Sequence, residues 1–246
     1  MSSLIDIFTS HKSDRSFTDQ PVDDAVLDRI ISAAYRAPTS VNSQQVSLVV
    51  SRDAAKRAQI SQIAGGQPWI AKAPVFITLV LDMHKSQVAM AAIDRQQLAH
   101  QSIESIVSGS TDVGIALGTL MAAARAEGLG IVPIGGIRRV PQELIALLNL
   151  PEHTFPVAGV VMGHVDQPAA QKPRLPLATF RHDERYQRAG LEQHIADYNK
   201  EILQHWKDTG RHDGESWSES VSGYYSKVYF PDVLPALKKQ GFGNDK

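Results

Sequence analysis

The chain contains 246 residues, of which 43% are hydrophobic, and its formal net charge is −1. This length allows one large domain with a substantial core, whereas the near-zero charge gives no general attraction to nucleic acid or to a membrane surface. The absence of cysteine excludes disulfides, thiolate nucleophiles and iron–sulfur clusters, so any redox chemistry requires a bound cofactor.

The first ten residues lack a basic region followed by a sustained apolar segment, which a secretory signal would need. The strongest apolar run, Val75–Leu81, has the length of a strand and is shorter than a membrane span. We therefore expect a cytoplasmic protein with neither nucleic acid nor membrane among its partners.

Two basic clusters predict a phosphate site. The first, HKSDR at residues 11–15, combines three potential cations with a hydroxyl just ahead of a helix start. The second consists of Lys172 and Arg174, which flank Pro173 and point to one side if the segment is extended. A solvated charged loop explains either cluster taken alone, whereas the two together favour one phosphate-bearing cofactor.

The first clear helix begins at Asp23 or Asp24, which can cap it, and ends before Pro38. Its apolar residues recur at helical spacing: Val26, Leu27, Ile30, Ile31 and Ala34. The following stretch, residues 37–45 (APTSVNSQQ), concentrates small hydroxyl and amide side chains. These can bind the polar edge of a planar ring, or they can serve as ordinary turn residues.

Four short segments rich in valine, isoleucine or leucine predict β-strands. They are Val46–Ser51, Val75–Asp82, Ile131–Ile134 and Val157–Met162. Their nearly continuous apolar runs indicate strands that are covered on both faces.

Two helices are predicted between the second and third strands, at Val88–Val107 and Asp112–Glu127, with Ser108-Gly109-Ser110 as the break between them. The second helix contains Gly114, Gly118 and several alanines. Glycine lowers helix propensity but permits close approach of another backbone. We expect this helix to be central or to lie at a subunit interface.

The glycines of residues 128–136 (GLGIVPIGG) do not have the spacing of a dinucleotide fingerprint. A helix C-terminal glycine at Gly128 or Gly130 explains the first part. The strand that follows ends at Gly135-Gly136, where a bare backbone could approach a flat ligand, or could simply form a tight turn.

Metalloprotease, P-loop and serine-hydrolase motifs are absent from the sequence. His100, His194 and His205 have polar neighbours in predicted helices, so we expect exposed side chains rather than metal ligands. No metal site is predicted.

The C-terminal quarter has a different character. Residues 168–176 form a proline-interrupted extended arm, and beyond Tyr186 the chain becomes polar and helical. It carries too many aromatic residues for a solvated tail: Trp206, Trp217, Tyr224, Tyr225, Tyr229 and Phe230. A partner subunit is the simplest surface for these side chains to pack on.

Taken together, HKSDR, APTSVNSQQ, GLGIVPIGGIR and KPRLP occur in the order and approximate spacing of nitroreductase-family flavoproteins. The chain resembles this family from about Asp6 to Tyr186 and more loosely to the C-terminus, and is most similar to the NADPH-dependent nitroreductase and flavin reductase branch. The resemblance implies an α+β fold with a central mixed β-sheet surrounded by helices, and an intertwined FMN-binding homodimer. It also implies one domain over residues 1–246, in which residues 187–246 form a helical extension that wraps the partner.

The resemblance also implies a cofactor site. His11, Lys12 and Ser13 match the first phosphate-binding segment, Lys172 and Arg174 match the second, and Arg15 matches a cation near the flavin pyrimidine. Thr39, Ser40 and Asn42 come from the other subunit; Gln67 lies at the polar edge of the ring; and Gly135 and Gly136 face the ring near its reactive nitrogen. Family members commonly have arginine where this chain has Lys12, which keeps the charge but loses the bidentate geometry.

The related branch binds the 2′-phosphate of NADPH with closely spaced arginines before a Trp-Ser pair. In this chain, only Arg211 in the loop of residues 209–218 matches, and Asp213 and Glu215 oppose its charge. We therefore expect NADPH as the electron donor, with NADH as the alternative.

The function implied is that of an FMN-dependent oxidoreductase that reduces nitroaromatics, quinones or related electron-poor acceptors by a ping-pong mechanism. No catalytic side chain is expected, because the flavin carries the chemistry. One alternative is a flavin reductase that supplies reduced FMN to another enzyme. An alternative of another class is a non-catalytic flavin-binding or regulatory module.

Overall fold

The structure is a computed structural model that describes residues 3–243. Its internal contacts divide the chain into two compact units. The described part of the first unit comprises residues 3–169 and 230–243, and the second unit is Ala170–Tyr229. The first unit contains the β-sheet, and the second consists of helices and extended chain.

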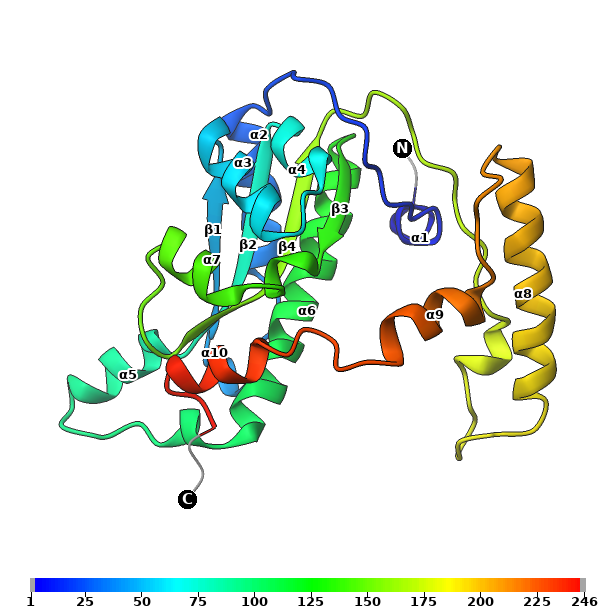
Figure 1. Ribbon diagram of the computed structural model, residues 1–246. Helices are drawn as coiled ribbons and strands as arrows, with labels where there is room; N and C mark the ends of the chain where they lie inside the picture. Colours follow the sequence, from blue (N-terminus) through cyan, green and yellow to red (C-terminus); the bar gives the residue numbers. More distant parts are fainter. Residues whose placement is uncertain (1–2, 244–246) are drawn as a thin grey trace. The chain divides into compact units, whose positions relative to one another are not determined.

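A four-stranded sheet forms the centre of the first unit (Figure 1), with the order β1-β2-β4-β3. The strands are β1 (Val46–Ser51), β2 (Val75–Asp82), β3 (Gly130–Ile134) and β4 (Thr154–Gly163). All four predicted strands and the α+β class are thus confirmed. The expectation of a mixed sheet is wrong for the described residues, where every strand pair is antiparallel. β1 and β2 are antiparallel neighbours, as are β3 and β4, so each of these two connections begins and ends at the same end of the sheet.

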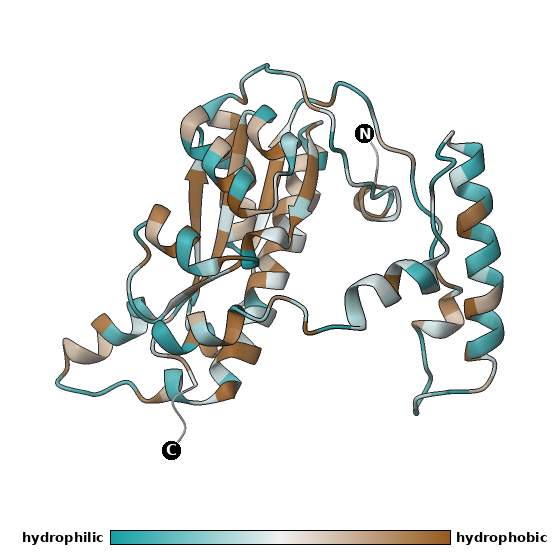
Figure 2. Ribbon diagram, viewed as in Figure 1, coloured by the Kyte–Doolittle hydropathy of each residue, from teal (hydrophilic) through white to brown (hydrophobic). Residues whose placement is uncertain are grey.

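Helices cover both faces of the sheet. On one face, Val75, Ile77 and Leu79 of β2 pack against α2 (Asp24–Tyr35) and α6 (Ile103–Ala126). On the other face, Phe76 of β2 packs against three shorter helices: α3 (Ala54–Ile63), α4 (Pro68–Lys72) and α7 (Pro141–Leu147). All eight residues of β2 are buried, and hydrophobic residues dominate the strands in Figure 2. The prediction of strands covered on both faces is therefore confirmed.

Helix α6 corrects the prediction of two helices separated at Ser108-Gly109-Ser110. It runs without a break through these residues for 24 residues. A Cβ atom on Gly109 would lie 2.1 Å from Cδ1 of Leu81, so the glycine allows α6 to approach β2 rather than ending the helix. The predicted helix Val88–Val107 is replaced by α5 (His84–Ala91) and a short 3₁₀ turn, η2 (Ala99–Gln101).

The sequence predicted an N-terminal cap for α2 and a C-terminal glycine for α6, and only the second is formed as predicted. Gly128 has φ +79°, and Leu129 N–H donates to Ala124 O at 2.9 Å, so α6 ends at a left-handed glycine as expected. Asp23 occupies the N-cap position of α2, but its side chain makes no capping hydrogen bond. Helix α6 is long and apolar enough to span a membrane, yet it packs on the sheet, as core helices do.

The C-terminal helix α10 (Val233–Lys239) and Phe242 close one end of the sheet, where they pack on Leu81 and Phe155. The expectation of an exposed His100 is wrong, because its ring stacks 4.1 Å from that of His153 in this region. His194 and His205 are half-buried on α8.

In the second unit, residues 170–176 are extended as predicted and are followed by η4 (Leu177–Thr179), α8 (Leu191–Asp208) and α9 (Trp217–Tyr225). The hydroxyl of Tyr198 on α8 donates to Pro173 O at 2.9 Å. Burial raises the pKa of this hydroxyl, which keeps it protonated. The Tyr198 ring also meets Trp217 of α9 edge to face, with centroids 6.3 Å apart. These contacts attach the extended arm to α8 and α9.

Candidate functional site

The basic segment at residues 11–15 follows the short helix α1 (Leu4–Thr9) and belongs to no helix or strand. His11, Lys12 and Ser13 are half-buried. Beyond the segment, Phe17 pairs with Val165 in an antiparallel bridge, so the chain here lies beside the residues that follow β4.

Arg15 begins a continuous set of contacts. Its guanidinium carbon lies 5.5 Å from the ring centroid of Trp69, which belongs to α4. Gln67 is the N-cap residue of that helix, and its Nε2 donates to Ala64 O at 2.9 Å. A Cβ atom on Gly136 would lie 2.5 Å from Gln67 Nε2 and 2.6 Å from the backbone oxygen of Ala64, which cannot move aside, so no larger residue fits there. Three predicted site residues thus lie around α4: Arg15 contacts Trp69 of this helix, and Gly136 packs against its N-cap residue, Gln67.

The electrostatics of this group favour an anionic or polar ligand. Partial desolvation lowers the pKa of the Arg15 guanidinium, and the neighbouring Asp14 carboxylate opposes that shift. Because the ordinary pKa of arginine lies far above neutral pH, Arg15 stays charged at neutral pH. The Nε1 atom of Trp69 is buried without a hydrogen-bond partner, which leaves one polar atom unsatisfied beside Arg15.

Gly135 lies just beyond the end of β3. A Cβ atom added there would lie 3.3 Å from a guanidinium nitrogen of Arg138, a tight but adjustable contact. Arg138 itself donates to Val157 O and lies over the ring of Phe230, with its guanidinium carbon 5.9 Å from the centroid. The Gly135-Gly136 turn is therefore packed between charged and polar side chains.

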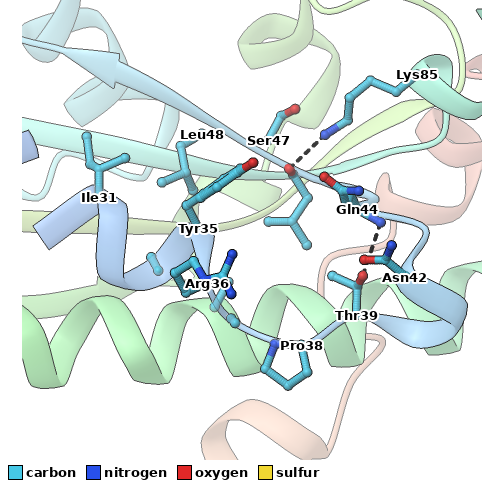
Figure 3. A pocket seen from close by; sticks show the side chains of 14 residues that line it. Ile31, Tyr35, Arg36, Pro38, Thr39, Asn42, Gln44, Ser47, Leu48 and Lys85 are labelled. Atoms are coloured by element: carbon cyan, nitrogen blue, oxygen red, sulfur yellow. Dashed lines mark hydrogen bonds between the residues drawn. The ribbon is translucent and has the colours of Figure 1, made fainter.

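Thr39, Ser40 and Asn42 belong to a separate group. Ser40 and Asn42 are in the 3₁₀ turn η1 (Ser40–Asn42), and Thr39 and Asn42 line a cavity of about 610 Å³ beside α2 and β1 (Figure 3). None of the residues at positions 11–15 belongs to the described lining of this cavity. Lys85 also lines it and donates to Val46 O at 2.9 Å.

This loop carries backbone strain. Val41, Asn42 and Gln44 all have positive φ, between +46° and +54°, and Val41 is a β-branched residue that is 94% exposed. The Oγ1 atom of Thr39 accepts a hydrogen bond from Gln44 N at 3.1 Å. Such conformations persist only where the surrounding structure enforces them, and they concentrate at functional sites.

The carboxylate of Asp112 in α6 holds this loop in its strained conformation. The side chain is 4% exposed, and its two carboxylate oxygens accept from Ser40 N–H at 3.2 and 3.1 Å. One of them also accepts from Gln45 Nε2 at 2.9 Å. One buried carboxylate thus anchors both ends of the strained turn.

The remaining predicted residues lie in the second unit. Lys172 Nζ and the Arg211 guanidinium carbon lie 4.9 and 4.8 Å from the ring centroid of Trp206. Arg174 Nη1 donates to the carbonyls of Lys172 and Pro173, and Lys172 and Arg174 line one open groove of about 660 Å³. The convergence of these two cations on one phosphate, with each other and with residues 11–15, stays a prediction.

Arg211 is already engaged by its own loop. Its Nε donates to Asp213 Oδ1 at 3.3 Å, and Trp206 Nε1 donates to Glu215 O at 2.9 Å. The opposing charge of Asp213, noted in the sequence, is thus in direct contact with the arginine.

Sequence reasoning missed two residues around these groups. The first is Trp69, and the signal that could have identified it is its position two residues after Gln67, a predicted ring contact. The second is Asp112, which no signal in the sequence identifies, because an acidic residue on a helix is usually exposed. No group of His, Asp and Glu side chains in residues 3–243 could hold a metal ion.

Comparison with known proteins adds independent findings. Residues 9–164 match the family model described as "Nitroreductase family", and residues 172–245 match "Nitroreductase family, C-terminal domain". A Bacillus subtilis (strain 168) relative named "FMN reductase", with NAD(P)H given in its name, is 42% identical over 249 residues, with 100% of both chains covered.

Two further matches cover nearly the full chain. An "Oxygen-insensitive NADPH nitroreductase" of Salmonella typhimurium is 31% identical over 243 residues, covering 98% of this chain and 99% of its own. The solved structure of B. megaterium NfrA2 has a TM-score of 0.96 at 41% identity, with 100% of both chains covered.

Proposed function

Because the chain belongs to the nitroreductase family, we propose that it is an FMN-dependent oxidoreductase that uses NADPH or NADH to reduce nitroaromatics, quinones or related electron-poor acceptors. The observation that carries this proposal is the row of contacts from Arg15 through Trp69 and Gln67 to Gly136. The family resemblance implies that three of these residues, Arg15, Gln67 and Gly136, are neighbours of one flavin ring.

The residues present fit FMN. A phosphate requires cations and hydroxyl or backbone donors, which His11, Lys12 and Ser13 supply in one unit and Lys172 and Arg174 supply in the other. A flat ring requires a polar edge and a backbone without side chains, which Gln67 and the Gly135-Gly136 turn provide.

FMN, when bound, supplies a carrier that accepts hydride from the nicotinamide and passes electrons to the acceptor from the same face. The chain's own residues hold and polarise that carrier. Arg15 contributes positive charge beside the pyrimidine edge, which favours electron uptake. Because Gln67 Nε2 is bonded to Ala64 O, its carbonyl oxygen is the atom left to accept from a ring N–H.

We further propose that the chain acts as a cytoplasmic homodimer in which Thr39, Ser40 and Asn42 contact the flavin of the partner subunit. Of the extension at residues 187–246 that the resemblance implies, we propose that residues 187–229 wrap around the partner. Residues 230–243 instead pack in the first unit of their own chain, and residues 244–246 lie outside the described part of the chain. The open face of α6 supports this arrangement. Gly114 and Gly118 have no neighbour within 4 Å of an added Cβ, and the exposed residues Ile103, Val107 and Ile115 are apolar. Light scattering on the purified protein is expected to give twice the mass of one chain; a monomer would contradict the proposal.

Arg211 is the proposed contact for the 2′-phosphate of NADPH, supported by its position over Trp206 beside Lys172. Its ion pair with Asp213 must be exchanged for the phosphate, so we expect a modest preference for NADPH. Arg211→Ala is expected to raise the KM for NADPH more than the KM for NADH. Equal effects on both donors would remove Arg211 from this role.

The test of the whole proposal is an absorption spectrum of the purified protein followed by anaerobic titration with NADPH and NADH. We expect a bound yellow chromophore that each donor bleaches and that a nitroaromatic or quinone restores. A chromophore that neither donor bleaches would indicate a non-catalytic flavin-binding module. Protein that neither carries flavin nor binds added FMN would contradict both readings.

The name of the Bacillus subtilis relative favours free flavin as a second candidate acceptor. A flavin reductase would oxidise NAD(P)H faster with free FMN than with nitroaromatics or quinones. Parallel steady-state rates with the three acceptors at matched concentrations distinguish the two functions.

A further inference from the structure

Asp14 lies in the middle of the basic segment at residues 11–15, where a negative charge works against phosphate binding. The residue is 1% exposed, although its neighbours are half-buried or exposed. A carboxylate a few ångströms from a bound phosphate repels it, because like charges interact strongly away from bulk water. The position of Asp14 therefore requires a role other than electrostatic attraction of the cofactor.

The Asp14 carboxylate contacts two distant parts of the chain, Ala169 and Arg125. Oδ1 accepts a hydrogen bond from Ala169 N–H at 3.0 Å, and Oδ2 lies 3.8 Å from Arg125 Nη1 in the last turn of α6. Gly130 makes room for the side chain, because an added Cβ there would lie 3.3 Å from Asp14 Oδ2 and 2.2 Å from Val165. Three parts of the first unit meet at this carboxylate.

The bond to Ala169 extends a pairing between two segments. Thr18 N–H donates to His164 O at 2.9 Å, and Asp166 N–H donates to Ser16 O at 3.0 Å. The Asp14 side chain continues this pairing by one further link, after the backbone bonds end. Ala169 is the last residue of the first unit, and Lys172 follows three positions later in the chain.

We propose that Asp14 is a positioning residue for the phosphate site. Its buried carboxylate fixes the backbone between Ser13 and Arg15 and, through Ala169, fixes the point from which the chain continues to Lys172 and Arg174. One side chain thus supports both basic segments without contacting the cofactor. This inference rests on the proposed function, because it assumes that these segments bind FMN.

The sign of the effect on FMN binding tests the inference. Asp14→Ala removes both the negative charge and the acceptor. We expect it to raise the Kd for FMN about tenfold, because FMN binding must then order a segment that a charge-assisted hydrogen bond holds in place in the wild type. Asp14→Asn removes the charge but keeps an oxygen that can accept from Ala169 N–H, so its Kd is expected to stay closer to that of the wild type. Turnover at saturating FMN is expected to stay at the wild-type level, because Asp14 does not contact the ring.

Flavin-free protein is titrated with FMN and followed by quenching of flavin fluorescence. Asp19→Ala, which removes an exposed carboxylate from the same stretch of chain, is the matched control and is expected to bind FMN like the wild type. If Asp14 acted only through its charge, Asp14→Ala and Asp14→Asn would both bind FMN more tightly. Tighter or unchanged binding by folded Asp14→Ala would overturn the inference.

If Asp14→Ala does not fold, the double variant Asp14→Leu/Arg125→Met decides the matter. Replacing a buried charge pair by apolar side chains of similar size often preserves stability. A folded double variant with weakened FMN binding supports the positioning role, and one with wild-type affinity overturns it. Wild-type protein that binds no FMN would instead contradict the proposed function.

Discussion

At the scale of single residues, buried carboxylates hold the loops that carry the predicted site residues. Asp112 accepts hydrogen bonds from Ser40 N–H and from the Gln45 side chain, and in this way it fixes a turn in which Val41 is held at positive φ. The cost of that strained conformation is of the order of 1–3 kcal/mol per residue, which the bonds to Asp112 must offset.

Asp112→Asn is expected to destabilise the protein. The amide group would present a donor to Ser40 N–H or to Gln45 Nε2, and a buried donor left without an acceptor costs about 1–3 kcal/mol. Urea unfolding measures the change, and amide hydrogen exchange at residues 39–45 is expected to accelerate. Asp94→Asn, at an exposed position, is the control. Wild-type stability and exchange in Asp112→Asn would contradict the anchoring role.

Residue patterns predicted which side chains could bind a cofactor but not which side chains hold them in place. Arg15, Gln67 and Gly136 could be assigned from their motifs, and the structure joins them through Trp69. The roles of Asp14 and Asp112 could not be assigned, because an acidic residue in a sequence is usually exposed. Their burial depends on contacts with Ala169 and Ser40, which are distant in the sequence.

At the scale of secondary structure, α6 connects the sheet with the loop at residues 39–45. It packs along β2, carries Asp112 on its buried face, and ends at Gly128 just before β3. The four strands could be predicted because their apolar runs are short and bounded by turn residues. The continuity of α6 could not, because Ser108-Gly109-Ser110 has the composition of a break, and only the proximity of Leu81 explains the glycine.

Gly109→Ala tests this explanation. In an exposed helix the change would stabilise by up to about 1 kcal/mol, because alanine has the higher helix propensity. Here the new Cβ would meet Leu81, and overpacking of a buried site costs about 1–3 kcal/mol, so we expect a net loss of unfolding free energy. Thr111→Ala, an exposed position on the same helix, is the control. A stabilised Gly109→Ala variant would show that α6 and β2 are not in close contact.

At the scale of the whole molecule, the C-terminal segment is hydrogen-bonded to two neighbouring histidines: His153 N–H donates to Gln240 O at 2.9 Å, and Gly243 N–H donates to His100 O at 3.0 Å. His153 Nδ1 lies 2.8 Å from Gln87 Oε1, and its ring stacks on His100. Burial lowers the pKa of His153 below its ordinary value of 6.5, and the nearby His100 and His84 lower it further, while Glu152 opposes them. The neutral imidazole is therefore the form that belongs to the folded state.

This shift predicts a stability that depends on pH. Between the lowered pKa of the folded state and about 6.5, the unfolded chain binds more protons, so the free energy of unfolding falls as the pH is lowered through that window. Above about pH 6.5 this contribution is constant. Urea unfolding at about pH 7.5 and about pH 5.5 measures the change, and His153→Asn is expected to reduce the difference. An unchanged difference in the variant would exclude His153 as its source.

The two basic segments belong to different units of the chain, and we propose that both bind the phosphate of FMN. Riboflavin carries the same ring without the phosphate, so Arg174→Ala is expected to weaken FMN binding while leaving riboflavin binding unchanged. Arg188→Ala, an exposed arginine of the same unit, is the control and is expected to affect neither ligand. The most direct measurement is the ratio of the Kd for riboflavin to the Kd for FMN, determined in the wild type and in Arg174→Ala. A ratio that falls in the variant is the predicted result, and a ratio that does not change would contradict the claim.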